Sequence, residues 1–269
     1  MKNPLLPLAG LLLAEVFTLS GCATSPMGRS QLTLMPDSEM SAMGGQAFLN
    51  LRQKTPLLQN QRANDYVECV AQALAREVGG QWEVAVFQDP AANAFALPGG
   101  KIGVNSGMLN VAANQHQLAA VIGHELSHVI ARHSNERISQ DMAVKQGLSM
   151  VQAVANPTSA TGQVAMGLLG VGAEYGVLLP YSRIQESEAD LMGLDLMAKA
   201  GFDPQESIGL WTNMGRASGG AQPAEFMSTH PSHATRIQDL NSRMPAALAL
   251  SRQAQANGKH PQCGQSQGR

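Results

Sequence analysis

Five consecutive residues, His124-Glu125-Leu126-Ser127-His128, have the types and the spacing that bind a zinc ion. Successive residues of an α-helix are rotated by about 100°, so histidines four residues apart lie about 40° apart on one helix face. Both imidazoles can then reach one tetrahedral zinc ion, and Glu125 projects toward the side where the water of the reaction would lie. The motif also arises by chance, so the rest of a site has to be found.

A catalytic zinc ion usually has three protein ligands, and a further histidine is one candidate for the third. The metzincin spacing requires a glycine at position 131 and a histidine at position 134, where this chain has Ala131 and Ser134. His133 lies five residues after His128, about 140° around the helix. We therefore expect His133 to face solvent or to support another residue, and not to bind zinc.

A carboxylate is the other candidate, and the segment Glu186-Ser187-Glu188-Ala189-Asp190 offers several. Glu186 and Asp190 share a helix face, whereas Glu188 is rotated by about 200° from Glu186. Two carboxylates on one face repel unless cations neutralise them. Zinc ligation by Glu186, with Asp190 accepting an N–H of a ligating histidine, would remove this conflict. An ordinary solvated acidic face is the alternative.

The composition is that of a folded domain with one sizeable core. The chain has 269 residues, of which 44% are hydrophobic and 14% charged, and its net charge is -2. No basic run is present, so nucleic-acid binding is not expected. Aromatic residues are sparse at 4%, whereas Ala, Leu, Gly and Met are abundant. This mixture favours helices that pack through small and flexible side chains.

The N-terminus has the features of an export signal. Residues 1–21 are expected to be a signal peptide, because a largely apolar stretch is followed by Leu19-Ser20-Gly21-Cys22, which resembles a bacterial lipobox. The resemblance implies lipidation of Cys22, and Ala23 after it favours the outer membrane. The stretch is too short and broken to span a membrane. A buried N-terminal helix is the alternative, and residues 22–36 are expected to be a tether.

Two further cysteines, Cys69 and Cys263, could form a disulfide in an oxidising compartment such as the periplasm. Nothing in the sequence fixes the distance between them. Cys69 as a simple buried apolar residue is an equally good interpretation.

The periodicity predicts an α+β fold that is mainly α. Helices are expected over about 37–53 and 61–78, and the motif helix begins after Asn114. Strand patterns at 82–86, 93–97 and 101–104 predict a small sheet of about three strands, with Pro98-Gly99-Gly100 as a hairpin or an irregular turn.

Later helices are expected over about 183–199, after Asp203, and from Ser232. Residues 141–180 contain no uninterrupted apolar run of about twenty residues, which favours two packed helices joined by a loop at 156–162 over a membrane insertion. The domain is expected to span residues 37–245, followed by a polar, flexible tail at 246–269.

His124-Glu-Leu-Ser-His128 together with Glu186-Ser-Glu-Ala-Asp190 resembles the gluzincin zinc metallopeptidases of the HtpX and CAAX-prenyl-protease type. The segments Asn93–Gly100, Thr229-His230-Pro231 and Arg236-Ile237 also resemble blocks of that family. The resemblance extends over about residues 40–245. The layout is most similar to that of the short, soluble periplasmic lipoproteins of the family, the BepA- and LoiP-like members.

The resemblance implies a gluzincin domain whose active-site helix packs against the small sheet. It implies one Zn²⁺ per chain, ligated by His124, His128 and Glu186 and supported by Asp190. It also implies that His230 lies near the metal, where it would ligate it, stabilise the transition state or gate activity. Without the resemblance, His230 is a turn residue before proline. Arg236 is either a surface residue or a cation that steadies the carboxylates or the oxyanion.

These observations predict a membrane-anchored zinc endopeptidase with Glu125 as its base and His230 as a further catalytic residue. The segment Asn93, Ala94, Phe95 and Ala96 is expected to be an edge strand on which an extended substrate lies. The resemblance implies quality control of unfolded or misfolded envelope proteins. Expected partners are such proteins, the membrane through the lipid on Cys22, and outer-membrane assembly machinery.

The expected location is the bacterial cell envelope, at the inner leaflet of the outer membrane and facing the periplasm. The alternative function is a chaperone-like or latent lipoprotein with a closed, regulatory zinc site, which would arise if His230 were a fourth protein ligand. A zinc hydrolase that does not act on peptides has no support beyond the shared motif.

Overall fold

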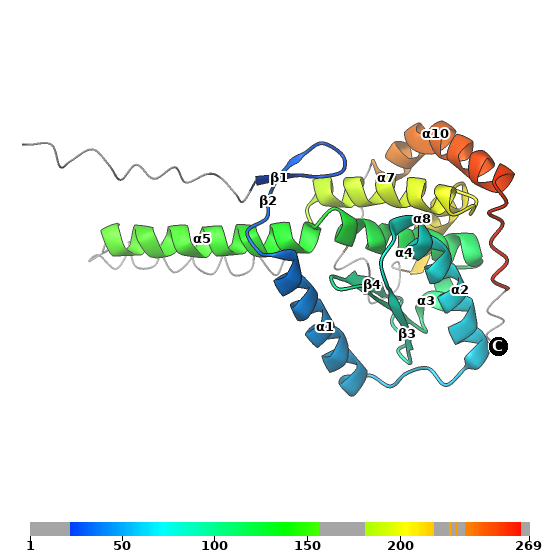
Figure 1. The fold of residues 1–269 in the computed structure, drawn as a ribbon, viewed down its shortest axis with the longest axis horizontal. Coiled ribbons are helices and arrows are strands. Elements are labelled where there is room, and N and C mark those ends of the chain that lie inside the picture. Colours follow the sequence, from blue (N-terminus) through cyan, green and yellow to red (C-terminus); the bar gives the residue numbers. More distant parts are fainter. Residues whose placement is uncertain (1–21, 156–180, 218–225, 227–229, 231–234, 265–269) are drawn as a thin grey trace, which may run out of the picture.

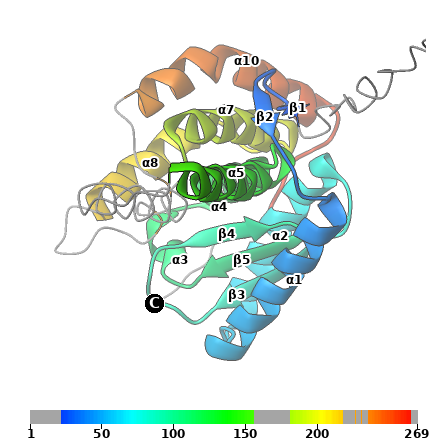
Figure 2. The same cartoon turned by 90° about the vertical axis from the view of Figure 1, so that its left-hand side faces the viewer.

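In the computed structural model, the described residues are 22–155, 181–217, 226, 230 and 235–264. Helix α4 (Gln115–Ile130) lies between a small sheet and helix α7 (Arg183–Lys199), and α10 (Arg236–Ala256) covers the outer side of α7 (Figures 1 and 2). The site is therefore built in the middle of a stack of layers. The expected signal peptide and the expected loop at 156–162 lie outside the described residues.

Helix α4 is buried almost from end to end. All its residues from Gln117 to His128 are buried, including both motif histidines and Glu125. A helix that is covered all round belongs to the interior of a domain. Its start is fixed by Asn114, whose Oδ1 accepts the backbone N–H groups of His116 and Gln117, both at 3.0 Å. The metal motif is thus carried by a rigid element and not by a loop.

The sheet has three strands, as expected, and their order is β3-β5-β4. β3 (Glu83–Phe87) is parallel to β5 (Lys101–Asn105), and β4 (Ala94–Leu97) is antiparallel to β5. The turn at 98–100 therefore closes a β-hairpin. β4 is an edge strand, and it contacts α4.

Two helices cover the two faces of this sheet. Helix α2 (Gln61–Val78) packs with α4 and with Val86, Ile102 and Val104 in the main hydrophobic core. On the opposite face, Phe48 of α1 (Asp37–Lys54) packs against Phe87 in a separate apolar cluster. The bounds of both helices agree with the expected ranges.

Helices α4 and α7 cross at two glycines. A Cβ atom added to Gly193 would lie 2.8 Å from the backbone nitrogen of His124, so any larger residue would force the helices apart. The crossing places the first half of α7 directly over the motif histidines. The start of α7 is fixed by a capping box, in which Ser182 accepts the backbone N–H of Gln185 and the Gln185 side chain accepts that of Ser182.

The remaining helices in the part of the chain that the structure describes are α3 (Met108–Val111), α5 (His133–Ala155) and α8 (Glu206–Ala217). α5 projects away from the body of the domain in Figure 1. The first of the two helices expected over residues 141–180 is thus the last part of α5. The second helix lies outside the described residues, as does the expected start of the last helix at Ser232.

The prediction of a flexible tail at residues 246–269 is wrong for the part of this segment that the structure describes. Helix α10 continues through Pro245 to Ala256, because Met244, Ala247 and Ala254 are buried against the domain. Beyond it, Lys259 forms an ion pair with Glu77 of α2 at 2.7 Å. Cys263 is bonded to Cys69 of α2, which decides the disulfide question left open by the sequence. Burial along one helix face outweighs the hydrogen bond that proline cannot donate.

The tether expected at residues 22–36 also packs on the domain. Strands β1 (Cys22–Thr24) and β2 (Ser30–Leu32) form an antiparallel hairpin, and Ser25 and Gln31 are buried. The Gln31 side chain donates to the carbonyl of Ala131 at 2.7 Å. Polar residues here mark a buried hydrogen-bonded contact and not a solvated linker, a distinction that composition does not make.

Among the helices in the described part of the chain, none has the length and apolar character needed to cross a membrane.

Candidate metal centre

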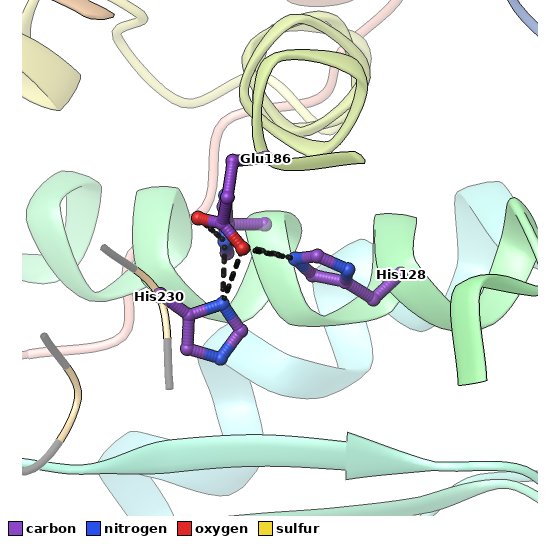
Figure 3. A group of neighbouring side chains, drawn as sticks. His128, Glu186 and His230 are labelled. Atoms are coloured by element: carbon purple, nitrogen blue, oxygen red, sulfur yellow. Dashed lines mark hydrogen bonds and ion pairs between the residues drawn. The ribbon is translucent and has the colours of Figure 1, made fainter. Parts of the chain in front are cut away.

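Four buried side chains converge on one point: His124 and His128 from α4, Glu186 from α7, and His230. Each offers one ligand atom, and these atoms lie within 4.8 Å of one another. Figure 3 shows Glu186 reaching down from α7 toward His128 of α4 and His230. The sequence expectation that these four residues meet is confirmed.

The spacing of the ligand atoms fits a tetrahedral zinc ion. Ligands about 2.05 Å from a tetrahedral centre lie about 3.3 Å from one another. Three of the six separations are close to this value: 3.1 Å between the Nε2 atoms of His124 and His128, 3.3 Å from His124 Nε2 to His230 Nδ1, and 3.4 Å from His128 Nε2 to Glu186 Oε1. Three imidazole nitrogens and a carboxylate oxygen are also the donors that zinc prefers. The residues therefore fit one zinc ion.

Asp190 and Arg236 hold the ligands in place from behind. Asp190 Oδ1 lies 3.0 Å from His124 Nδ1, so it accepts the N–H that leaves Nε2 free for the metal. The Arg236 guanidinium donates to Asp190 Oδ2 and to Glu186 Oε2, both at 2.6 Å, and stacks on the ring of Trp211 at 3.9 Å. Arg236 is only 2% exposed, so of its two expected roles the structure shows the clamp on the carboxylates.

These contacts set the ionisation of the ligands. Burial acts to raise the pKa of Glu186, but hydrogen bonds with His128 and His230 and the charge of His124 outweigh it and hold the pKa well below its usual range. Burial lowers the pKa of His128 well below its ordinary value. Burial also lowers the pKa of His124, but its hydrogen bond to Asp190 and the charge of Glu186 reverse the shift and raise it. A cation at the centre would take the place of the second proton of His124.

Glu125 lies beside the cluster and next to the sheet. It is 3% exposed, and its Oε1 is 3.4 Å from His230 Nε2. Burial raises its pKa, although the charges of His230 and His124 and a hydrogen bond from the backbone of Ala96 lower it in part. A carboxylate with a raised pKa holds a proton more readily, as a general base in hydrolysis must.

The backbone of β4 directs the groups of alternate residues away from β5, toward this site. The amide of Asn105 donates to the carbonyl of Asn93 at 2.9 Å, and pairs alternate along an antiparallel ladder, so Ala94 and Ala96 direct their backbone groups to the outer edge. The side chains of Ala94 and Ala96 pack in the main core. The Phe95 side chain packs on the far face with Phe87, and its backbone pairs with Gly103 of β5, so Phe95 offers neither to the expected substrate edge.

The structure adds residues that the sequence did not indicate. The ring of Tyr181 stacks on that of His128 with centroids 3.9 Å apart, and its hydroxyl lies 3.1 Å from Ser134 Oγ. No spacing rule points to Tyr181, which directly precedes the capping residue of α7. His133 is fully buried, which excludes the solvent-facing alternative. Glu188 is also buried, although its rotation from Glu186 sets it apart from the metal face.

Comparison with known protein families agrees with this geometry. The family model "Peptidase family M48" matches residues 57–244, which is most of the chain and includes every residue of the cluster. The chain belongs to peptidase family M48. Its members are zinc-dependent metallopeptidases, so the M48 domain of this chain carries the site for one zinc ion. The gluzincin resemblance drawn from the two motifs is therefore confirmed at the level of the family.

Curated relatives are similar over much of this M48 chain. The mitochondrial metalloendopeptidase OMA1 of Schizosaccharomyces pombe is 42% identical over 168 residues, covering 62% of this chain and 48% of the relative. The metalloendopeptidase OMA1, mitochondrial, of Homo sapiens is 31% identical over 257 residues, covering 89% and 49%. The beta-barrel assembly-enhancing protease of Escherichia coli is 27% identical over 239 residues, covering 86% and 49%. The chain spans about half the length of the curated relatives that it matches.

These relatives correct the expected location. The bacterial-envelope location predicted from the lipobox-like segment is contradicted, because relatives at 31% to 42% identity from yeasts, a plant and vertebrates are mitochondrial proteins. They also do not support the predictions of a lipoprotein and of a periplasmic protein. The BepA- and LoiP-like assignment within the family is not confirmed. Lipidation of Cys22 stays a prediction, since residues 1–21 lie outside the described part.

Proposed function

We propose that this chain is a zinc-dependent endopeptidase that hydrolyses peptide bonds in unfolded or misfolded proteins. The observation that carries the proposal is the convergence of His124, His128 and Glu186 on one tetrahedral centre with Glu125 beside it. The M48 match and the metalloendopeptidases among the relatives support the reaction class. The net charge of -2 supports a protein substrate over a nucleic acid.

In this proposal His124, His128 and Glu186 hold the zinc ion. When bound, zinc would polarise the scissile carbonyl and lower the pKa of the attacking water. Glu125 accepts a proton from that water and delivers it to the leaving amine, for which its raised pKa is suited. His230 Nε2 lies 3.4 Å from Glu125 Oε1. At this position it is close enough to donate to the oxyanion that forms when the water attacks the scissile carbonyl.

The substrate is proposed to bind as an extended strand along β4. Its backbone would pair with the outward-directed groups of Ala94 and with the carbonyl of Ala96, whose amide already bonds Glu125. This pairing requires an unfolded segment but little sequence specificity. A cavity of about 170 Å³ lies at the end of this strand, lined by Met40 of α1, Pro98 and Gly99 of the turn, and His128. One substrate side chain would enter this cavity beside the metal. A larger cavity of about 600 Å³ near Asn110 includes no residue of the metal cluster.

The test compares wild-type protein with Glu125→Gln on casein, a loosely folded substrate, with zinc measured in both. We expect one zinc ion per chain in both proteins and cleavage by wild type alone, because glutamine cannot carry the proton. Equal cleavage by both proteins, or a wild type that binds no zinc, would contradict the proposal.

The position of His230 favours a second candidate, a latent or chaperone-like protein with a closed, regulatory zinc site. His230 Nδ1 lies 3.0 Å from Glu186 Oε1 and 3.3 Å from His124 Nε2, which places it among the ligands. A fourth protein ligand would occupy the position that water needs. His230→Ala separates the two functions: a closed site would retain zinc and cleave casein faster, whereas loss of an oxyanion donor would make cleavage slower.

A further inference from the structure

The N-terminal hairpin brings a cation to the back of the metal centre. The β1–β2 hairpin lies beside the start of α5 and α7 in Figures 1 and 2. Arg29, in the turn of this hairpin, donates from Nη2 to Glu136 Oε2 of α5 at 2.7 Å and to Glu188 Oε2 of α7 at 2.8 Å. Ser25 Oγ donates to Glu188 Oε1 at 2.6 Å. Glu136 and Glu188 are 2% and 7% exposed, so their charges need this partner.

From Glu188 the hydrogen bonds continue to a zinc ligand. His133 Nε2 lies 3.1 Å from Glu188 Oε2, and His133 Nδ1 lies 2.9 Å from His128 Nδ1. His133 is fully buried, so both of its ring nitrogens are committed to these two partners. An unbroken chain of contacts therefore runs from Arg29 to Glu188, His133 and His128.

The direction of every proton in this chain follows from the metal site. His128 must present a lone pair at Nε2 to bind zinc, so its proton is on Nδ1 and is donated to His133 Nδ1. His133 must then carry its own proton on Nε2, which it donates to the Glu188 carboxylate. No other assignment satisfies both bonds with neutral imidazoles.

His124 and His128 are thus supported by different means. His124 donates directly to a carboxylate, Asp190, at 3.0 Å. The corresponding nitrogen of His128 reaches its carboxylate through an intervening imidazole. In zinc sites such partners fix the tautomer and the orientation of the ligand and raise its basicity.

We infer that Arg29, Glu188 and His133 are positioning residues for the zinc ligand His128, and that the N-terminal hairpin is thereby a part of the metal site. The inference rests on the proposed zinc site. It assigns a role to each acid of the segment 186–190: Glu186 binds the metal, Asp190 orients His124, and Glu188 orients His128 through His133. It also ties zinc affinity to a segment about 100 residues away in sequence from the motif.

The test measures zinc affinity by competition with a chelator in the full chain and in His133→Phe, Glu188→Gln and Arg29→Gln. The visible absorption spectrum of the Co²⁺-loaded proteins is the second measurement, because it reports ligand geometry. We expect His133→Phe to weaken zinc binding by about 10- to 100-fold and to shift the Co²⁺ bands. Glu188→Gln and Arg29→Gln should change the zinc affinity and the Co²⁺ bands in the same direction by smaller amounts.

Arg132→Gln is the matched control. Arg132 is adjacent to His133 but pairs with exposed Asp37 of α1, so its loss should leave zinc affinity and the Co²⁺ spectrum unchanged. The inference would be overturned if His133→Phe, Glu188→Gln and Arg29→Gln all kept the wild-type zinc affinity and Co²⁺ spectrum, even with lower thermal stability. That result would leave the proposed function standing. If His133→Phe does not fold, the two glutamine variants decide by the same criterion. A wild type that binds no zinc would overturn both.

Discussion

Two carboxylates, Glu186 and Asp190, lie side by side in the interior, where one guanidinium donates a hydrogen bond to each of them. Arg236 donates to each of them at 2.6 Å and is shielded from water by Trp211. A buried charge that loses its partner typically costs about 3–5 kcal/mol. The bridge from α10 to α7 is therefore part of the metal site as well as of the fold.

Arg236→Met should lower the free energy of unfolding of the zinc-free protein by about 3–5 kcal/mol, measured by urea denaturation. Arg243→Met is the control, since Arg243 joins the same two helices through an exposed pair with Asp195 and should cost no more than about 1 kcal/mol. Equal losses in the two variants would show that burial of the Arg236 clamp has no special energetic role.

Much of the site was predictable residue by residue. The 100° rotation of a helix places His124 with His128, and Glu186 with Asp190, and this rule led to three of the four residues of the metal cluster. The fourth, His230, followed only from the family resemblance. The same rule excluded Glu188 from the metal site. The rule describes the faces of one helix and contains nothing about the neighbouring elements that surround the helix. Glu188 meets His133 because α5 begins there, and no spacing within one segment contains that information.

At the scale of elements, the site depends on how closely α4 and α7 approach. Gly193→Ala should lower the free energy of unfolding by about 1–3 kcal/mol and weaken zinc binding, because the added methyl group would lie 2.8 Å from the His124 backbone. Gly45→Ala is the control, since a Cβ there meets nothing within 4 Å in the middle of α1. It should stabilise the protein by about 0.5–1 kcal/mol. Thermal unfolding and chelator competition measure both, and a Gly193→Ala protein as stable as wild type would contradict the close crossing.

The N-terminal hairpin makes stability depend on acid pH. Burial acts to raise the pKa of Glu136, but hydrogen bonds from Arg29 and Gln185 outweigh it and lower the pKa below 4.5. A lowered pKa means that the carboxylate stabilises the fold above about pH 4.5, and that this contribution is lost as the pH falls through the folded-state pKa. Glu136→Gln should therefore flatten the decline of unfolding free energy below pH 4.5. Glu39→Gln, a surface change on α1, is the comparison. An unchanged slope in Glu136→Gln would refute the prediction.

Elements with strong local signals were predicted closely, and long-range ones were not. The bounds of α2 and α7 follow from periodicity and caps. The packing of the hairpin and of the last part of α10 depends on contacts with distant segments, such as Gln31 with Ala131 and Lys259 with Glu77. Local composition in both places resembles that of a linker, which is why a tether and a tail were expected.

For the molecule as a whole, the disulfide closes the chain on itself. Cys69 and Cys263 are 194 residues apart in sequence, so the bond ties the segment that follows α10 back to α2. Cross-links of this kind typically stabilise by about 2–4 kcal/mol. Reductant should lower the unfolding free energy of wild type by that amount and leave a Cys69→Ser/Cys263→Ser protein unaffected. Zinc content should not change, because neither cysteine contacts the metal site. Equal sensitivity of both proteins to reductant would contradict the pairing.

Everything proposed for this protein depends on one zinc ion held by His124, His128 and Glu186. Anomalous diffraction from crystals grown with zinc, recorded on both sides of the zinc absorption edge, tests it most directly. For wild type we expect a single strong anomalous peak within about 2.3 Å of His124 Nε2, His128 Nε2 and a Glu186 carboxylate oxygen. Crystals of Glu186→Ala should show no such peak. A wild-type structure with no peak there, or with its zinc bound by other residues, would contradict the assignment of these three ligands.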